Sequence, residues 1–286
     1  MLSLFITWSP SPEIFTIPGI DWPVRWYGLS WALAFIGSHF FMNRIFRTEG
    51  RTDKQLDTLT LYIVLATVLG ARIGHCLFYD FGYYSQHPLE ILKVWEGGLA
   101  SHGGALGILT GMWLYCRKTG ESWWWLFDRL VVVVPFASMC IRLGNLMNSE
   151  IVGKITDVAW GFKFPLNDED KLNVLQYQIP IPVRHPAQLY EAVFYLFLFL
   201  LFYWLWKARR NHVGKGFMFG LFCILMFSFR FLMEFMKENQ SEFENALPIN
   251  MGQILSIPFI VLGTVMVIRS FKLKYTNTQS FKHDSA

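Results

Sequence analysis

The sequence has little charge and few cysteines. Asp, Glu, Lys and Arg make up 16% of its 286 residues, whereas soluble domains carry about 25%. The four cysteines all lie in apolar runs and none forms a C-x-x-C pair, which argues against a disulfide framework or a zinc site. The first basic residue is Arg25, so we expect no cleavable signal peptide. A net charge of +4 gives no indication of a nucleic-acid partner.

Apolar and aromatic residues are abundant instead. They make up 53% of the chain, with 27 Phe and 12 Trp, and the mean hydropathy is +0.33. Lipid is therefore the expected solvent. A membrane-spanning helix needs about 20 mostly apolar residues, and seven windows qualify: Trp26–Met42, Leu59–Phe78, Gly98–Tyr115, Trp123–Ile141, Leu189–Trp206, Phe217–Met236 and Gly252–Ile268.

We therefore expect an all-α polytopic membrane protein with one domain, residues 1–286, and seven transmembrane helices. Residues 1–24 contain four prolines and predict an irregular arm rather than a helix. The long connection, residues 142–187, predicts a small ordered cap. Residues 269–286 form the expected tail, and the last dozen of them have the composition of a disordered segment.

Basic residues predict the orientation in the membrane. Most Lys and Arg residues outside the windows lie in the first, third and fifth connections and in the tail. Because cytoplasmic segments are enriched in Lys and Arg, we expect the N-terminus outside and the C-terminus in the cytoplasm. The arm and the cap then face the outer, periplasmic side.

Polar side chains gather at the predicted outer ends of the windows. Charges in spanning helices are costly and usually mark function, so this pattern predicts one polar cavity opening to the outer leaflet. The residues concerned are Arg25, Tyr27, Arg72, His75, Tyr79, Asp80, His102, Arg142, Asn145, Asn148, Glu150, His185, Gln188, Tyr190, Glu191, Arg230, Glu234 and Gln253.

The composition of this cavity favours an anionic phospholipid headgroup. Arg72, Arg142 and Arg230 offer planar donors suited to phosphate. Asn145 adds a neutral donor, as does Asn148. His102 could accept a proton and lies on a glycine-rich segment, where the backbone can be approached closely. No cluster of metal ligands is visible, and we expect neither a metal nor a cofactor.

Several of these residues also have purely structural interpretations. Gly103, Gly107 and Gly111 form overlapping G-x-x-x-G steps typical of helix packing. Arg230 and Glu234 could neutralise each other at i, i+4 spacing. Three further structural interpretations are an interfacial anchor for Asp128–Arg129, an aromatic belt for Trp123–Trp125 and a helix start for His185–Pro186. For Arg72, a structural and a functional role are equally favoured.

Six stretches in order carry a resemblance to a known family. They are Trp26-Tyr27-Gly28-Leu29, Arg72-Ile73-Gly74, Ser101-His102-Gly103-Gly104, Arg142-Leu143-Gly144-Asn145 with Asn148 and Glu150, His185-Pro186-Ala187-Gln188-Leu189-Tyr190-Glu191, and Met251-Gly252-Gln253-Ile254-Leu255-Ser256-Ile257-Pro258. Together they resemble the bacterial phosphatidylglycerol–prolipoprotein diacylglyceryl transferases, over residues 26–258.

The resemblance implies a multi-pass enzyme of the bacterial plasma (inner) membrane. Such an enzyme moves the diacylglyceryl group of phosphatidylglycerol onto the lipobox cysteine of a preprolipoprotein, forms a thioether and releases glycerol phosphate. Its partners are thus phosphatidylglycerol, preprolipoprotein signal peptides and membrane lipid. The resemblance implies essential or important roles for Tyr27, His102, Arg142, Asn145, Gly153 and Arg230, and places Glu150 and Glu234 in the same pocket.

Three positions depart from the family pattern. The family usually has Tyr one turn before the late arginine, where this chain has Met226. It usually has Gly immediately before the arginine of the central signature and Gly after the second asparagine, where this chain has Ile141 and Ser149. The backbone around the central signature is thus the part of the resemblance that the structure must test.

Our hypothesis makes His102 the base that takes the thiol proton, with Arg142 and Arg230 on the phosphate, and Asn145 and Tyr27 on the headgroup. In the alternative, His102 only positions the substrate and the arginines lower the thiol pKa. Two other classes are less favoured. An anion transporter should show internal repeats and polar residues that continue to the cytoplasmic face, and a rhomboid-type protease should show G-x-S-x-G.

Overall fold

The computed structural model describes residues 5–19, 21–93, 98, 100–237 and 249–272. The chain is mostly helical, as expected. The elements are β1 (Ile6–Thr7), β2 (Glu13–Ile17), β3 (Trp22–Arg25), α1 (Trp26–Thr48), α2 (Asp53–Phe78), α3 (Phe81–Gln86), η1 (Pro88–Leu92), α4 (Ser101–Thr119), α5 (Trp123–Met147), β4 (Phe162–Lys163), α6 (Asp168–Tyr177), β5 (Val183–Arg184), α7 (Ala187–Arg209), α8 (Phe217–Met233), η3 (Glu234–Met236) and α9 (Met251–Ser270). The expected disorder of the last dozen residues falls outside the described residues.

Every hydropathy window contains a long helix. Five of these helices, α2, α5, α7, α8 and α9, are long and apolar enough to cross a membrane, so the chain is a multi-pass membrane protein. The helices extend past most window edges. The largest extension that affects the site is in α5, which continues to Met147 rather than stopping at Ile141. Arg142 and Asn145 therefore lie inside the helix, and the expectation that they follow it was wrong.

The chain forms two compact units. One combines Met1–Ser38 with Asp128–Ala286, and the other is His39–Phe127. We refer to them as the first and second unit. Each is described by itself, because their placement relative to one another is not determined.

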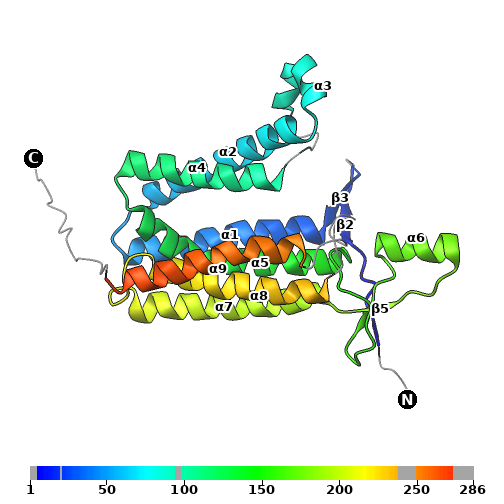
Figure 1. Ribbon diagram of the computed structural model, residues 1–286. Helices are drawn as coiled ribbons and strands as arrows, with labels where there is room; N and C mark the ends of the chain where they lie inside the picture. The colour runs from blue at the N-terminus through cyan, green and yellow to red at the C-terminus, as the bar shows by residue number, and fades with distance from the viewer. Residues whose placement is uncertain (1–4, 20, 94–97, 99, 238–248, 273–286) are drawn as a thin grey trace, which may run out of the picture. The chain divides into compact units, whose positions relative to one another are not determined.

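The first unit is a helical bundle joined by aromatic and small residues. Phe136 of α5 lies against Gly37 of α1 and packs on Phe199 of α7 with 5.3 Å between ring centroids. Phe202 of α7 and Phe222 of α8 are 5.9 Å apart. Helices α8 and α9 run side by side (Figure 1), where Gly220 and Gly263 let their backbones approach. The bundle thus follows the order α1, α5, α7, α8, α9.

Strands and α6 lie at the end of this bundle where α5 and α8 finish (Figure 1). Strand β1 pairs in parallel with β4, β4 pairs antiparallel with β5, and β2 and β3 form a separate antiparallel pair. As expected, residues 5–19 and 21–25 contain no helix, but they include strands and so are not wholly irregular. The prolines of the arm are compatible with strands because a two-stranded sheet has only edge strands, and Pro23 lies in β3.

A small apolar cluster ties the cap region to α5. Leu146, Phe162 and Phe164 are buried together, and Trp8 packs against them. The indole Nε1 of Trp8 donates to the carbonyl of Leu146 at 2.9 Å. This cluster fixes the last turn of α5, which carries the central signature.

The second unit is dominated by the close pairing of α2 with α4. A Cβ at Gly103 would overlap the carbonyl oxygen of Gly70, and one at Gly107 would overlap that of Ala66. The packing interpretation of the G-x-x-x-G steps is confirmed. Because α2 and α4 are antiparallel neighbours, Arg72 near the end of α2 and His102 at the start of α4 occupy the same end of this pair.

Burial of two residues differs from their sequence-based interpretations, although Trp123 and Trp124 are only half-buried. Trp125 is buried rather than part of an interfacial belt, since its Nε1 donates to Glu49 at 2.6 Å and the Arg51 guanidinium lies 3.6 Å from its ring. Asp128 is fully buried rather than an interfacial anchor. Its carboxylate accepts the backbone N–H groups of Gly216 at 2.8 Å and Phe219 at 2.9 Å, and so caps the start of α8.

Candidate functional site

Polar side chains of the first unit meet where α5 and α8 finish and where α1, α7 and α9 begin. Tyr27 is in the first turn of α1, and Arg142 and Asn145 are in the last turns of α5. Glu191 is in the first turns of α7, and Arg230 is in the last turn of α8. Segments far apart in the chain thus contribute to one region.

Arg142 and Asn145 form the centre of a hydrogen-bond network. Their i, i+3 spacing on α5 puts them on one face of the helix, and Arg142 Nη1 donates to Asn145 Oδ1 at 3.2 Å. Asn145 Nδ2 donates to Glu150 Oε2 at 3.3 Å, and Asn148 Nδ2 donates to Glu150 Oε1 at 3.0 Å. The carboxylate of Glu150 therefore orients both amides, and through Asn145 it also orients the arginine.

The turn after α5 brings Glu150 back over the helix end. The backbone N–H of Glu150 donates to the carbonyl of Asn145 at 3.0 Å, and Gln188 Nε2 donates to the carbonyl of Glu150. Ser149 and Ile151 on either side have φ of 55° and 56°, a left-handed conformation that favours glycine. Ser149 thus adopts a left-handed conformation that glycine, the family's usual residue here, adopts without steric cost because it has no Cβ.

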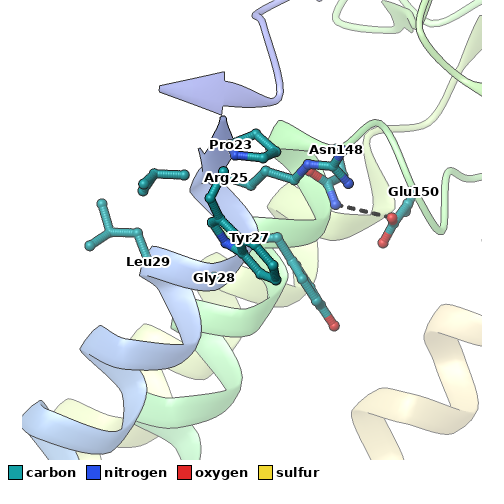
Figure 2. Close-up of a pocket in the computed structure, with 9 residues that line it drawn as sticks. Pro23, Arg25, Tyr27, Gly28, Leu29, Asn148 and Glu150 are labelled. Atoms are coloured by element: carbon teal, nitrogen blue, oxygen red, sulfur yellow. Dashed lines mark hydrogen bonds between the residues drawn. The ribbon is translucent and has the colours of Figure 1, made fainter. Parts of the chain in front are cut away.

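An open pocket of about 650 Å³ adjoins this network. Figure 2 shows Tyr27 and Leu29 on the α1 side and the hydrogen-bonded pair Asn148 and Glu150 on the other. Gly144 of α5 lets α1 approach, since a Cβ there would lie 3.1 Å from Cδ2 of Tyr27. The pocket is lined by Trp22, Pro23, Val24, Arg25, Tyr27, Gly28, Leu29, Asn148 and Glu150.

Two buried residues with no predicted role complete the network: Glu191 contacts Arg142 directly, and Lys237 contacts it through Glu191. Glu191 Oε2 lies 2.6 Å from Arg142 Nε, and Lys237 Nζ donates to Glu191 Oε1 at 2.6 Å. Both are almost fully buried. Glu191 belongs to the polar group predicted at the start of α7, whereas Lys237 directly follows the sixth window and has no predicted role. One sequence signal could have indicated a role for Lys237. It directly follows the predicted span that contains Arg230 and Glu234.

Arg230 and Glu234 form a second, looser pair. Arg230 Nε lies 3.9 Å from Glu234 Oε1, and Glu234 Oε2 accepts from Asn250 Nδ2 at 3.1 Å. Asn250 and Gln253 form the capping box of α9, so Gln253 has a structural role. The hydroxyl of buried Tyr195 on α7 lies within electrostatic reach of both Arg142 and Arg230. This phenol is near the late arginine, although Met226 replaces the family's usual tyrosine.

Gly153 is held where no side chain fits. Its N–H donates to the carbonyl of His185 at 2.9 Å, and it forms a β-bridge with Lys237. A Cβ at Gly153 would lie 2.7 Å from the His185 carbonyl oxygen and 2.9 Å from that of Met236. His185 and Pro186 precede α7 directly, which confirms their interpretation as a helix start.

The second unit contains the other two predicted site residues. His102 is exposed in the first turn of α4. Arg72 is buried, and its guanidinium donates to the carbonyls of Ile91 at 2.9 Å, Glu90 at 2.6 Å and Gly98 at 3.4 Å. These contacts favour the structural interpretation of Arg72, since backbone carbonyls use the donors expected for phosphate.

The structure therefore gathers one part of the predicted site. In the first unit it brings together Tyr27, Arg142, Asn145, Asn148, Glu150, Gly153, Arg230 and Glu234 at one end of the bundle. His102 and Arg72 share an end of the second unit, and a single cavity that holds both groups stays a prediction. Among the residues that the structure describes, no three His, Cys, Asp or Glu side chains lie close enough together to hold a metal ion.

This arrangement can bind an anion through guanidinium and amide donors beside an open pocket.

Comparisons with known proteins show which family this chain resembles. The family model described as prolipoprotein diacylglyceryl transferase matches residues 12–269. Proteins named phosphatidylglycerol–prolipoprotein diacylglyceryl transferase from Bacteroides fragilis and Tolumonas auensis are 43% and 42% identical to this chain. These alignments cover 92% and 93% of the chain and 94% and 98% of the relatives. The relative of that name from Chloroherpeton thalassium is 40% identical over 94% of the chain and 96% of its own length.

Proposed function

The chain belongs to the prolipoprotein diacylglyceryl transferase family, and we propose that the network around Arg142 binds the phosphatidylglycerol that this enzyme consumes. The protein transfers the diacylglyceryl group of phosphatidylglycerol to the thiol of the lipobox cysteine of a preprolipoprotein. The observation that carries the binding proposal is that Asn145 and Glu191 hold Arg142 in a network whose Asn148 and Glu150 line an open pocket.

The chemistry requires one bond exchange. A carbon–sulfur bond forms at the carbon of the diacylglyceryl group that carries the phosphate ester, and the bond between that carbon and the phosphate oxygen breaks. Glycerol phosphate leaves with the electron pair, and the thiol proton passes to a base. A free cysteine has a pKa of about 8.5, so a base beside the thiol raises the fraction of reactive thiolate.

Each step has a candidate residue. The guanidinium groups of Arg142 and Arg230 bind the phosphate and stabilise the departing anion. Asn145, Asn148 and Tyr27 orient the glycerol headgroup, and Gly153 keeps the cap segment against the site. Glu150 orients the amides, and Glu234 holds Arg230 loosely. His102 takes the thiol proton, a role for which general base catalysis typically contributes about 10²–10⁴-fold.

The apolar helices and the distribution of basic residues support a proposed membrane placement. We propose that α1 and α4 span the membrane together with the five more apolar helices, which gives seven spans. The N-terminus is then outside and the C-terminus is in the cytoplasm of a bacterium, with the protein in the inner membrane. This placement puts the Arg142 network at the outer leaflet, where a phospholipid headgroup and an exported signal peptide can meet.

A transfer assay tests the proposed function. Purified protein is mixed with phosphatidylglycerol vesicles and a lipobox peptide, and mass spectrometry follows the peptide. We expect a diacylglyceryl adduct on the cysteine and none with vesicles of phosphatidylcholine alone. A peptide that stays unmodified by a folded preparation in the presence of phosphatidylglycerol contradicts the proposal.

The role of His102 has its own test. His102→Gln keeps a hydrogen-bonding side chain but removes the proton acceptor. We expect turnover at pH 7 to fall by about 10²-fold or more, with partial recovery at higher pH as the peptide thiol ionises by itself. Near-normal turnover at pH 7 would leave His102 with a positioning role only.

A further inference from the structure

The carboxylate of Glu191 is shared between two cations. One oxygen lies 2.6 Å from Arg142 Nε, and the other accepts a hydrogen bond from Lys237 Nζ at 2.6 Å. The side chain of Glu191 is 2% exposed and that of Lys237 is 7% exposed, whereas that of Arg142 is 23% exposed. Of the three, only Arg142 is open enough to meet a ligand.

Arg142, Glu191 and Lys237 form a charged triad, and its net charge depends on Lys237. Two cations and one anion leave one net positive charge, which an anionic headgroup can neutralise when it reaches Arg142. Without Lys237, Glu191 would pair with Arg142 alone, and the buried pair would be neutral. Because charges interact strongly where water is excluded, this difference should change the affinity for an anion.

Lys237 is also held in place by the cap segment. Its backbone forms a bridge with Gly153, and the N–H of Lys154 donates to the carbonyl of Met236 at 2.7 Å. A buried lysine costs free energy unless it is paired, so Glu191 and Lys237 hold each other. This fixes the carboxylate at Nε of Arg142, while Nη1 donates to Asn145.

We propose that Lys237 is a positioning residue for substrate binding, which acts through Glu191 to leave Arg142 with charge available for the phosphate of the lipid. The inference rests on the proposed function, because it assumes that Arg142 binds phosphatidylglycerol. Lys237 touches neither substrate. It sets the strength of the anion site rather than the chemistry of transfer.

The test measures KM and kcat for phosphatidylglycerol in mixed micelles, together with inhibition by glycerol phosphate. Lys237→Met removes the charge but keeps most of the buried side-chain volume, and Glu191 keeps Arg142 as a partner. We expect KM for the lipid and the inhibition constant for glycerol phosphate to rise by about tenfold, with kcat changed by less than about threefold. Lys237→Arg should restore both values.

Two further variants separate charge from structure. Lys154→Gln removes the same charge from an exposed lysine whose backbone N–H donates to Met236, and it should leave KM unchanged. In the double variant Lys237→Met with Glu191→Gln, Arg142 is no longer neutralised, so KM should return towards the wild-type value. A lysine that only supports folding would instead lower kcat through a smaller active fraction, and the double variant would not recover.

The outcomes distinguish this inference from the proposed function. If the wild-type protein makes no adduct, the proposed function fails. If the wild type is active and Lys237→Met has an unchanged KM and an unchanged inhibition constant, the role of Lys237 is contradicted. A double variant with a KM as high as that of Lys237→Met also contradicts it.

Discussion

The residues around Arg142 show how a charge can be placed inside an apolar helix. Its guanidinium contacts Glu191 and Asn145, and the carboxylate that it pairs with is also held by Lys237. A buried charge without such partners would cost several kcal/mol. These contacts keep the arginine at one orientation before substrate arrives, which is the property that an anion-binding site requires.

Ser149 carries a residue-scale prediction. It has φ of 55°, and its hydroxyl has no hydrogen-bond partner among the residues that the structure describes. Ser149→Gly removes both penalties, so we expect the protein to gain about 1 kcal/mol of stability and to keep its activity. Thermal unfolding in detergent measures the first effect and the transfer assay the second. A lower unfolding temperature would contradict the assigned backbone conformation.

At the scale of elements, the sequence predicted every long helix but not where each one ends. The apolar windows identify α1, α2, α4, α5, α7, α8 and α9, because lipid-facing helices need a continuous apolar surface, but they do not identify the short helices α3 and α6. The window for α5 stopped before Arg142, since hydropathy treats a paired charge like an unpaired one. The start of α2 has a different sequence signal, because Thr52 and Gln55 form a capping box ahead of the apolar stretch.

The contact between α2 and α4 gives an element-scale prediction. A Cβ at Gly107 would overlap the backbone of Ala66, so Gly107→Ala must push the two helices apart. We expect a loss of about 1–3 kcal/mol and a lower unfolding temperature. Gly82→Ala is the matched control, because nothing lies within 4 Å of a Cβ there. Equal behaviour of the two variants would contradict the close packing.

The start of α8 gives a second element-scale prediction. Asp128 accepts the backbone N–H groups of Gly216 and Phe219, and Asp128→Ala leaves these buried donors without their acceptor. The expected loss is about 1–3 kcal/mol, seen as a lower unfolding temperature in detergent. Asp128→Asn keeps one acceptor oxygen and should lose less. An alanine variant as stable as the wild type would show that the cap contributes nothing.

At the scale of the whole molecule, the sequence indicates which polar residues could belong to the proposed site but not which of them contact one another. The position of polar residues at helix ends predicts which end of the helices carries the proposed site. The pairing of Arg142 with Glu191, and of Glu191 with Lys237, could not be read from spacing, because these residues lie far apart in the sequence and meet only through packing. The sequence therefore does not indicate the contact of Lys237 with Glu191, which only the fold reveals.

The central claim is that the planar guanidinium of Arg142 binds the lipid phosphate, and Arg142→Lys in the transfer assay tests it most directly. Lysine keeps the charge but loses the fork of parallel donors. The account predicts that the diacylglyceryl adduct on the lipobox peptide falls by about 10²-fold or more, while the variant remains folded in detergent. A lysine variant that transfers the diacylglyceryl group at the wild-type rate would contradict it.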